Sequence, residues 1–407
     1  MKSLHWFKVF AGLCCLLLAL PVRAAVPGVY PDRIVIGGVM DLEGHSRGLG
    51  QGMRDGILAA LEGETIRGRR IEYITLNDSY NPALTVQRVN ELIERGIFAM
   101  VGNVGTPTAK VALPILARNS IPAVGFFTGA GLLRPGVGDV INFRASYVQE
   151  TAAVIQQGLR NGLKPAEICA FVQNDAYGMA GVQGIRQALS GAPGSTVILD
   201  KLDRILADES GRQRNNIGPV GVYERNTLAS RAGYDSLKAW ERSQNTHCRL
   251  VVTVGTYSAV ARFAAYARQK GDDWLISAVS FTGADNLRDT LARFNVRDRV
   301  VMTQVVPDVG SDLPIVEEAR RKLGERFSHV SLEGYIVGRM FVALMNRIEG
   351  PLTPRALVRA AQGQRFGLGG LTLDFTDDNQ GSDLVTLTYF NNNRYDTMQA
   401  SLWQQLF

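Results

Sequence analysis

The stretch VGNVGTPTAK, residues 101–110, decides the fold because a strand ends and a helix begins within it. An apolar run stops at a glycine, and Thr106 with the following proline starts a helix. Threonine suits the N-cap, and proline suits the first helical position, which needs no backbone N–H. In open α/β sheets, small anions bind where such a helix N-terminus faces the carboxyl end of a strand. We therefore expect the N–H groups of Thr108 and Ala109 and both threonine hydroxyls to face a binding site.

Outward from this stretch, apolar runs alternate with amphipathic stretches in two series that meet near residue 145. Short β-branched runs separated by helices imply parallel strands with right-handed crossovers. The first series predicts strands at Ile34–Met40, Ile71–Leu76, Phe98–Val101 and Pro122–Phe126, and helices at Leu49–Glu62, Pro82–Arg95 and Pro107–Arg118. The second predicts strands at Ile168–Gln173, Val197–Asp200, Leu250–Val254, Leu275–Val279 and Val300–Val306, and helices at Tyr177–Leu189, Asp235–Ser243, Tyr257–Gln269 and Ala284–Arg293. The sequence thus predicts an α/β fold of two doubly wound, Rossmann-like lobes.

Two further regions lie within or after these series. Residues 203–226 are polar and contain glycine, which predicts a surface excursion. The end of the chain predicts two helices, Leu313–Phe327 and Leu332–Ile348, and a closing pair of strands, Leu371–Phe375 and Leu384–Phe390.

The N-terminus has the pattern of a secretory signal over residues 1–24. Lys2 and Lys8 precede an apolar run, and small residues precede Ala25, where we expect cleavage. Loss of this segment lowers the formal net charge from +6 to +3, because it carries three basic residues and no acidic one. The remaining basic residues are dispersed, so no nucleic-acid partner is expected.

Cys169 and Cys248 are the cysteines that remain in the exported chain. An oxidising compartment would allow them to pair. They fall on or beside strands that we expect at different heights in the sheet, so the prediction is that they stay unpaired.

Ser46 raises the question of catalysis, because GHSRG, residues 44–48, fits the Gly-x-Ser-x-Gly nucleophile elbow of α/β-hydrolases. The context is poor, since the motif follows the first strand and no motif surrounds the histidines that could serve it, His247 and His329. A secreted serine hydrolase using Ser46 nevertheless stays open as an alternative.

Cofactor and metal motifs are missing from the sequence. The glycine-rich stretches are not Gly-x-Gly-x-x-Gly, and the histidines have no metal-ligand spacing. The stretch DFTDDNQGSD, residues 374–383, has Thr376 and Gln380 where a calcium loop needs acidic ligands, so we expect a solvated turn. No cofactor and no metal are predicted.

Six segments together carry a family resemblance: GNVGTPTA (102–109), IPAVGFFTGA (121–130), INFRASY (141–147), VQNDAYG (172–178), VVTVGTYS (251–258) and VVMTQVVP (300–307). In this order and spacing they resemble periplasmic solute-binding proteins of the leucine/isoleucine/valine-binding type, along essentially the whole mature chain. The resemblance implies a monomeric, non-enzymatic receptor in the periplasm that delivers a small amino acid or related carboxylate to the permease of an ABC importer. A ligand-sensing protein for a membrane signalling partner shares the same clamp and remains an alternative.

The resemblance also implies a division of the chain into two lobes joined by a three-segment hinge. The crossings would fall near 143–146, 304–307 and 366–372. The first lobe would comprise residues 25–143 and about 308–366, and the second about 144–307 and 367–407. Ligand that touches both lobes would stabilise the closed form.

Site residues follow from the resemblance position by position. Thr106, with Thr108 beside it, matches the threonine or serine that holds the ligand carboxylate, and Phe127, Thr128 and Gly129 match the turn that contacts the same end. Tyr177 and Tyr257 match tyrosines that cover the ligand. Thr282 stands where amino acid binders carry an acid for the ammonium, so Glu43 is our candidate replacement. Phe126, Phe127 and Phe281 suggest an apolar wall.

Overall fold

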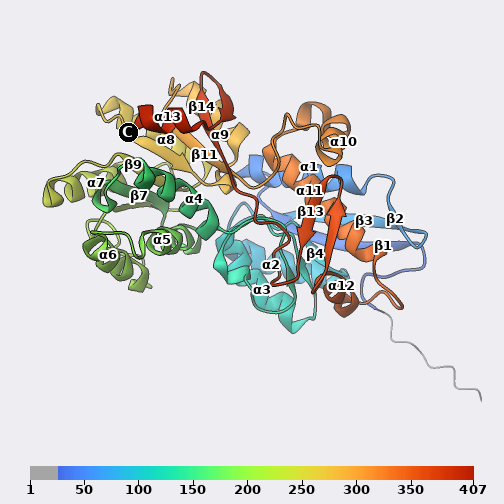
Figure 1. Ribbon diagram of the computed structural model, residues 1–407. Coiled ribbons are helices and arrows are strands. Elements are labelled where there is room, and N and C mark those ends of the chain that lie inside the picture. Colours follow the sequence, from blue (N-terminus) through green and yellow to red (C-terminus); the bar gives the residue numbers. More distant parts are fainter. Residues whose placement is uncertain (1–25) are drawn as a thin grey trace, which may run out of the picture.

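The computed structural model describes residues 26–407, so the predicted signal at 1–24 and the cleavage before Ala25 lie outside the described residues. Two lobes lie side by side (Figure 1), and each is built on its own sheet. The prediction of a two-lobed α/β fold is confirmed.

The first sheet has the strand order β2-β3-β1-β4-β5-β6 and is parallel except for the β2–β3 hairpin. Its strands are β1 (Arg33–Met40), β2 (Thr65–Ile66), β3 (Arg69–Asn77), β4 (Met100–Val101), β5 (Ala123–Val124) and β6 (Val140–Ile141). The helices of this lobe are α1 (Arg47–Leu61), α2 (Pro82–Glu94), α3 (Thr106–Arg118), α10 (Pro314–Leu323), α11 (His329–Asn346) and α12 (Pro354–Ala361).

The second sheet has the order β15-β14-β11-β10-β9-β7-β8, with β14 and β15 antiparallel at one edge. Its strands are β7 (Ile168–Gln173), β8 (Val220–Tyr223), β9 (Leu250–Val254), β10 (Leu275–Ala278), β11 (Val300–Gln304), β14 (Thr386–Asn391) and β15 (Arg394–Thr397). The helices are α4 (Tyr147–Arg160), α5 (Ala176–Leu189), α6 (Thr196–Ala207), α7 (Arg231–Gln244), α8 (Tyr257–Gln269), α9 (Ala284–Arg293) and α13 (Ala400–Leu406).

Helix α11 is buried almost all round and is held in the first lobe by close packing against α1. Glycines allow this approach: a Cβ on Gly56 would lie 2.1 Å from the Ser331 carbonyl oxygen, and one on Gly334 would lie 2.4 Å from the Met53 carbonyl oxygen. Because a side chain at either position would push the helices apart, α11 is a fixed part of this lobe.

Two predictions in the second lobe are wrong. Residues 197–200, predicted as a strand, lie in α6, where Ile198, Leu202 and Ile205 form one buried helical stripe. The predicted surface excursion at 203–226 contains β8, which is buried at the edge of the sheet. A four-residue apolar run does not distinguish a strand from a helix; the helical spacing of the buried residues over the whole of α6 does.

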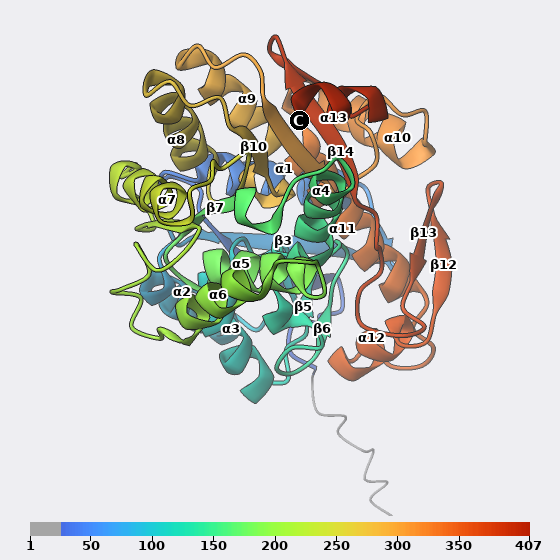
Figure 2. The same ribbon diagram turned by 60° about the vertical axis from the view of Figure 1, so that its left-hand side comes forward.

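The expected closing strand pair also does not form. Strand β13 (Leu371–Asp374) pairs with β12 (Arg365–Leu368), whereas β14 pairs with β11 in the second sheet. Figure 2 shows the β12–β13 hairpin beside α12. Backbone hydrogen bonds join Ile315 N–H to Gly369 O at 2.9 Å and Asn142 N–H to Asn379 O at 2.8 Å. The chain up to residue 381 therefore contacts the first lobe, and β14 is its first segment in the second sheet.

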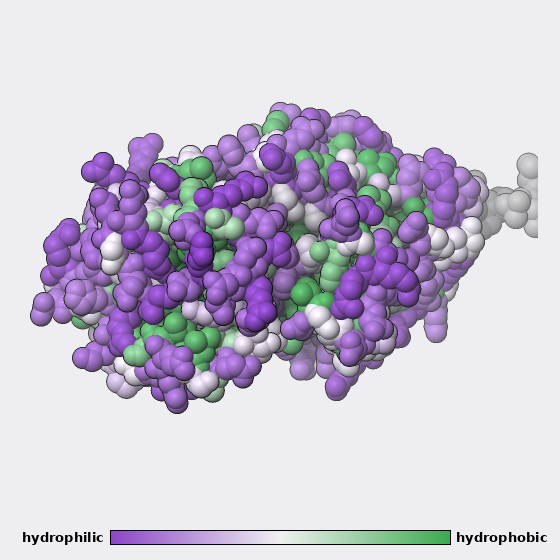
Figure 3. Space-filling view, turned by 90° about the horizontal axis from the view of Figure 1, so that it is seen from above, coloured by the Kyte–Doolittle hydropathy of each residue, from purple (hydrophilic) through white to green (hydrophobic). Residues whose placement is uncertain are grey.

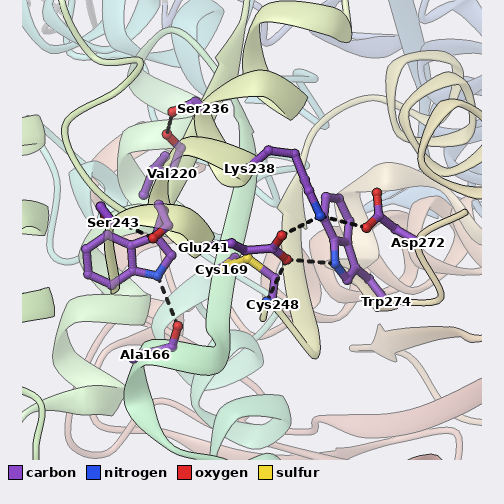
Figure 4. The surroundings of a disulfide bond; sticks show 11 residues. Ala166, Cys169, Val220, Ser236, Lys238, Glu241, Ser243, Cys248, Asp272 and Trp274 are labelled. Carbon is purple, nitrogen blue, oxygen red and sulfur yellow. Dashed lines mark hydrogen bonds and ion pairs between the residues drawn. A yellow bond between two sulfur atoms is a disulfide. The ribbon is translucent and has the colours of Figure 1, made fainter. Parts of the chain in front are cut away.

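The prediction of unpaired cysteines is wrong as well, because Cys169 and Cys248 form a disulfide with a Cα–Cα distance of 5.7 Å (Figure 4). Strands β7 and β9 are neighbours in the sheet, with Ile168 opposite Leu250. Glu241 accepts the Cys248 N–H at 2.8 Å and so fixes the bend that brings Cys248 back to Cys169. The sequence alone did not reveal that pairing of strands.

The outer surface seen in Figure 3 is mostly hydrophilic, with small separate hydrophobic patches. Within residues 26–407, no helix has the combination of length and apolar character that a membrane span requires.

Candidate functional site

The turn at Thr106 is built differently from the prediction, and the assignment of Thr106 as N-cap is wrong. Gly105, with φ of 110°, is the N-cap of α3, and Thr106 is the first helical residue. A Cβ at Gly105 would lie 2.3 Å from the Tyr80 ring, so glycine is required there by both conformation and space. The Thr106 hydroxyl is thereby free of capping and shares a 2.6 Å hydrogen bond with the Thr128 hydroxyl.

The turn after β5 brings Thr128 to this position. Thr128 is fully buried, like Thr106, and its Oγ1 also accepts the Ala130 N–H at 3.3 Å. Gly129 follows, and a Cβ there would lie 2.8 Å from the Tyr147 nitrogen, so the turn depends on close backbone contact. Thr108 does not join this pair, because its hydroxyl donates to Val104 O at 2.7 Å, in the turn just before α3.

Aromatic rings from both lobes meet beside the threonine pair. Phe281 of the second lobe has its ring centroid 5.2 Å from that of Phe127 and 6.3 Å from that of Tyr80, both in the first lobe. The Tyr177 ring lies 4.7 Å from Phe281 and 5.4 Å from Tyr147. All five side chains are buried, so the lobes are closed on one another in this structure.

We call these residues the interlobe cluster: Tyr80, Thr106, Phe127, Thr128, Tyr147, Tyr177 and Phe281. Their polar groups are hydroxyls, and burial raises the pKa of Tyr147 to about 12 and the pKa of Tyr177 well above its usual value. The Tyr147 hydroxyl is buried and has no hydrogen-bond partner among residues 26–407. The cluster therefore offers neutral donors and acceptors next to flat apolar rings.

Thr282 lies at the border of this cluster, whereas Tyr257 lies apart from it. The Thr282 hydroxyl donates to Gly255 O at 2.9 Å, and the Tyr177 hydroxyl donates to the same oxygen at 3.3 Å. Tyr257 starts α8 and is half-buried; burial raises the pKa of its hydroxyl despite a hydrogen bond from the Gly48 backbone. Its hydroxyl thus meets the start of α1 in the opposite lobe.

Glu43 is not brought into the cluster. Its side chain is exposed, and its carboxylate accepts a hydrogen bond from Asn77 at 3.1 Å. Asp41, which the sequence did not single out, is the buried acid of this loop, and its oxygens accept the Gly44 N–H at 2.6 Å and the Ser46 N–H at 2.8 Å.

Ser46 is the N-cap of α1, and its buried hydroxyl has no partner among the described residues. No histidine is therefore in place to activate it, as a serine nucleophile requires. Likewise, the described part of the chain contains no group of three or more His, Cys, Asp or Glu side chains that could hold a metal ion.

Arg144 is a buried charged residue that the sequence analysis did not select, although it lies within the segment INFRASY. Its guanidinium lies 4.8 Å from the centroid of the Phe127 ring and is fully buried. A lone arginine beside a predicted hinge gives no sign in the sequence of which partners it meets.

A cavity of about 1160 Å³ opens beside the interlobe cluster, between α3 and residues 206–215. Its walls include Pro107 and Lys110 of the first lobe and Asp175 and Tyr223 of the second. The cluster itself is packed ring against ring, so this cavity is an open space at the edge of the interface and not the cluster's own interior.

Comparison with known proteins defines the class. The family described as "Periplasmic binding protein" matches residues 33–201. A possible leucine/isoleucine/valine-binding protein from Rhodopirellula baltica has 34% sequence identity and a TM-score of 0.78, with 94% of this chain and 99% of that chain covered. A search of curated proteins gave no match.

More distant structures share the fold. A leucine-binding protein from Thermotoga maritima has 16% identity and a TM-score of 0.71, over 90% of this chain and 96% of that one. A solute-binding protein from R. palustris in complex with 4-hydroxybenzoate has 15% identity and a TM-score of 0.70, over 90% of this chain and 96% of that one. The chain belongs to the type I periplasmic binding protein family, whose members are non-enzymatic extracytoplasmic proteins that bind small molecules for ABC transporters.

Proposed function

We propose that this protein is the receptor of an ABC importer and that its ligand is a small carboxylate without an α-ammonium group, held at the interlobe cluster. The observation that carries the proposal is the buried Thr106–Thr128 hydroxyl pair at the N-terminus of α3. The two hydroxyls share one hydrogen bond, and Thr128 Oγ1 also accepts the Ala130 N–H at 3.3 Å, so the hydroxyl protons can turn to the oxygens of a carboxylate. The Thr108 N–H, which donates to no described backbone carbonyl, adds partial positive charge at the same point. The expectation that the Ala109 N–H also faces the site is wrong, because this N–H donates to Gly105 O at 3.0 Å.

The acids around the cluster support a ligand without an ammonium. Asp41 is occupied by backbone N–H groups, Glu43 is exposed, and Asp285 accepts from the His329 backbone and ring at 2.9 Å. Glu150 and Glu333 both face the Arg144 guanidinium, and Asp175 pairs with Arg225 at 3.1 Å. Thr282 bonds to a carbonyl and carries no charge. A buried ammonium without a countercharge is costly, so an α-amino acid fits this site poorly.

The remainder of the ligand would lie against Phe127 and Phe281, whose rings suit an aliphatic or aromatic body. The fold is compatible with either ligand class, because it is shared by a leucine-binding protein and by a protein in complex with 4-hydroxybenzoate. The neutral lining of the cluster is therefore the reason to favour a carboxylic acid.

Closure would take place about three crossings of the chain. We keep the first two near 143–146 and 304–307, and we propose that the third is residues 382–385 in place of the predicted 366–372. This change rests on the hydrogen bonds that join residues 369 and 379 to the first lobe. Residues up to about 381 would then move with the first lobe.

A calorimetric titration with matched ligand pairs tests the proposal. Each pair would contain an amino acid and its des-amino acid, such as leucine with 4-methylpentanoate and phenylalanine with 3-phenylpropanoate, and 4-hydroxybenzoate would be added as an aromatic acid. We expect binding of an acid and rejection of its amino partner by about tenfold or more, which is 1.4 kcal/mol. Tight binding of an amino acid with no binding of the corresponding acid would contradict the proposal.

A further inference from the structure

Arg144 is the centre of a buried charge cluster that joins the two lobes. It lies in the first crossing, between β6 and α4, and is 1% exposed. Its guanidinium meets the Glu150 carboxylate at 3.4 Å and the Glu333 carboxylate at 3.5 Å, and it donates to the Ser280 hydroxyl. Glu150 belongs to α4 of the second lobe, whereas Glu333 belongs to α11 of the first.

The two carboxylates differ in the number of hydrogen bonds that the protein donates to them. Glu150 accepts the Ser280 N–H at 2.7 Å and the Thr303 hydroxyl in addition to its contact with Arg144. Glu333 accepts no hydrogen bond from a described residue, and its ionic contact with Arg144 is long. The protein therefore stabilises a negative charge on Glu150 and provides little for a second one on Glu333.

Among the three residues in direct contact, two carboxylates face a single guanidinium, so ionisation of both would leave one negative charge without a contacting partner. Protonation of Glu333 would make this trio neutral. Arg134, which donates to the Arg144 carbonyl oxygen at 2.7 Å, is a further positive charge near Glu333 and opposes its protonation. Burial raises the pKa of Glu333 to about 7, although the neighbouring Arg144 opposes this shift. In an open form, with water reaching α11, the pKa of Glu333 would return toward its usual value of 4.5.

A second titratable group on the same face of α11 also contacts the second lobe. His329 lies one helical turn before Glu333, and its Nδ1 is 2.9 Å from the Asp285 carboxylate of α9 in the second lobe. The other charged or titratable groups near the two side chains are Arg134, Arg288, Asp308, Arg394 and Tyr395.

We propose that Arg144, Glu150 and Glu333 form a proton-dependent lock that favours the closed form at acidic pH and weakens it as the pH rises. The inference rests on the two-lobed clamp of the proposed function but not on the identity of its ligand. Closure takes up a proton on Glu333, so the ratio of closed to open protein falls as the pH rises from about 4.5 to about 7. Ligand affinity would follow the same direction, because ligand binds between the lobes.

The test measures the distance between the lobes without ligand. Lys110→Cys and Arg212→Cys introduce spin labels at two exposed residues on opposite walls of the cavity at the edge of the interface. Cys169 and Cys248 are joined in a disulfide and so present no free thiol to the label. Distance distributions from pulsed electron spin resonance at about pH 5.5 and about pH 8 give the closed and open fractions.

We expect the closed-to-open ratio of the parent protein to be about tenfold or more higher at the lower pH. Glu333→Gln, which keeps the shape and removes the charge, should stay closed at both pH values. Arg339→Met serves as the matched control, because Arg339 is also on α11 but pairs with Glu64 inside the first lobe; it should retain the pH response of the parent.

Two results would overturn the lock. One is a closed fraction that does not change between the two pH values in the parent protein. The other is a Glu333→Gln variant that keeps the full response, with His329→Gln abolishing it instead, which would assign the effect to His329 alone. Failure of the ligand titrations would leave these distance measurements unaffected, so the two proposals are tested separately.

Discussion

Replacement of both Cys169 and Cys248 by alanine should destabilise the second lobe by roughly 4 kcal/mol. The disulfide closes a loop with a sequence separation of 79 residues. In the chain-entropy description, removal of the cross-link returns about 4.5 kcal/mol of conformational freedom to the unfolded chain at 25 °C. The folded lobe loses little in exchange, because Glu241 continues to accept the Cys248 N–H and to fix the bend before β9.

Urea unfolding followed by circular dichroism measures this change, with ligand binding as the internal control. The disulfide lies at the amino ends of β7 and β9, whereas the interlobe cluster follows their carboxyl ends, about 15 Å away at the usual rise per residue. Affinity of the folded variant should therefore be unchanged. A loss of less than about 1 kcal/mol in the free energy of unfolding would refute the loop-closure reasoning.

Three further predictions concern single side chains. Thr106→Ala and Thr128→Ala should each weaken the binding of a carboxylate ligand by about 1–3 kcal/mol in calorimetry, since a hydrogen bond to a charged group is lost. Thr108→Ala should leave affinity unchanged, because its hydroxyl donates to the Val104 carbonyl oxygen in the turn before α3. Burial raises the pKa of Asp78 to about 6, so the folded protein binds a proton at this residue more tightly than the unfolded chain does. The free energy of unfolding should therefore fall by roughly 3 kcal/mol as the pH rises from about 4 to about 6. Urea unfolding across this pH range measures the change, and Asp78→Asn should remove most of it. Glu43→Gln should leave ligand affinity unchanged within error, and a tenfold loss would return Glu43 to the site.

Much of the first lobe could be predicted from the sequence, because its signals are local. The strand at 34–40 and the helix at 82–95 were recognised from apolar periodicity and from the Asn81 cap, and both lie within a residue or two of the prediction. The prediction of a strand at 197–200 was wrong because four residues are too few to show a helical period. The buried positions Ile198, Leu202 and Ile205 together show that the segment is a helix. Local patterns decide an element only when the element is long enough to repeat them.

The sequence by itself determined the alternation of strands and helices and the two-lobed class of fold, and it predicts the Thr106 turn as part of the site. Tertiary structure alone decided which residues meet: Phe281 reaches Phe127 from the other lobe, and Cys248 reaches Cys169 through neighbouring strands. Arg144 contacts Ser280 across 136 residues of chain and Glu333 across still more. Periodicity and helix capping depend on neighbours within a few residues of each other in the sequence. The contacts named above join residues far apart in the sequence, and they form only when strands pair and the two lobes pack together, so a local sequence pattern does not predict them.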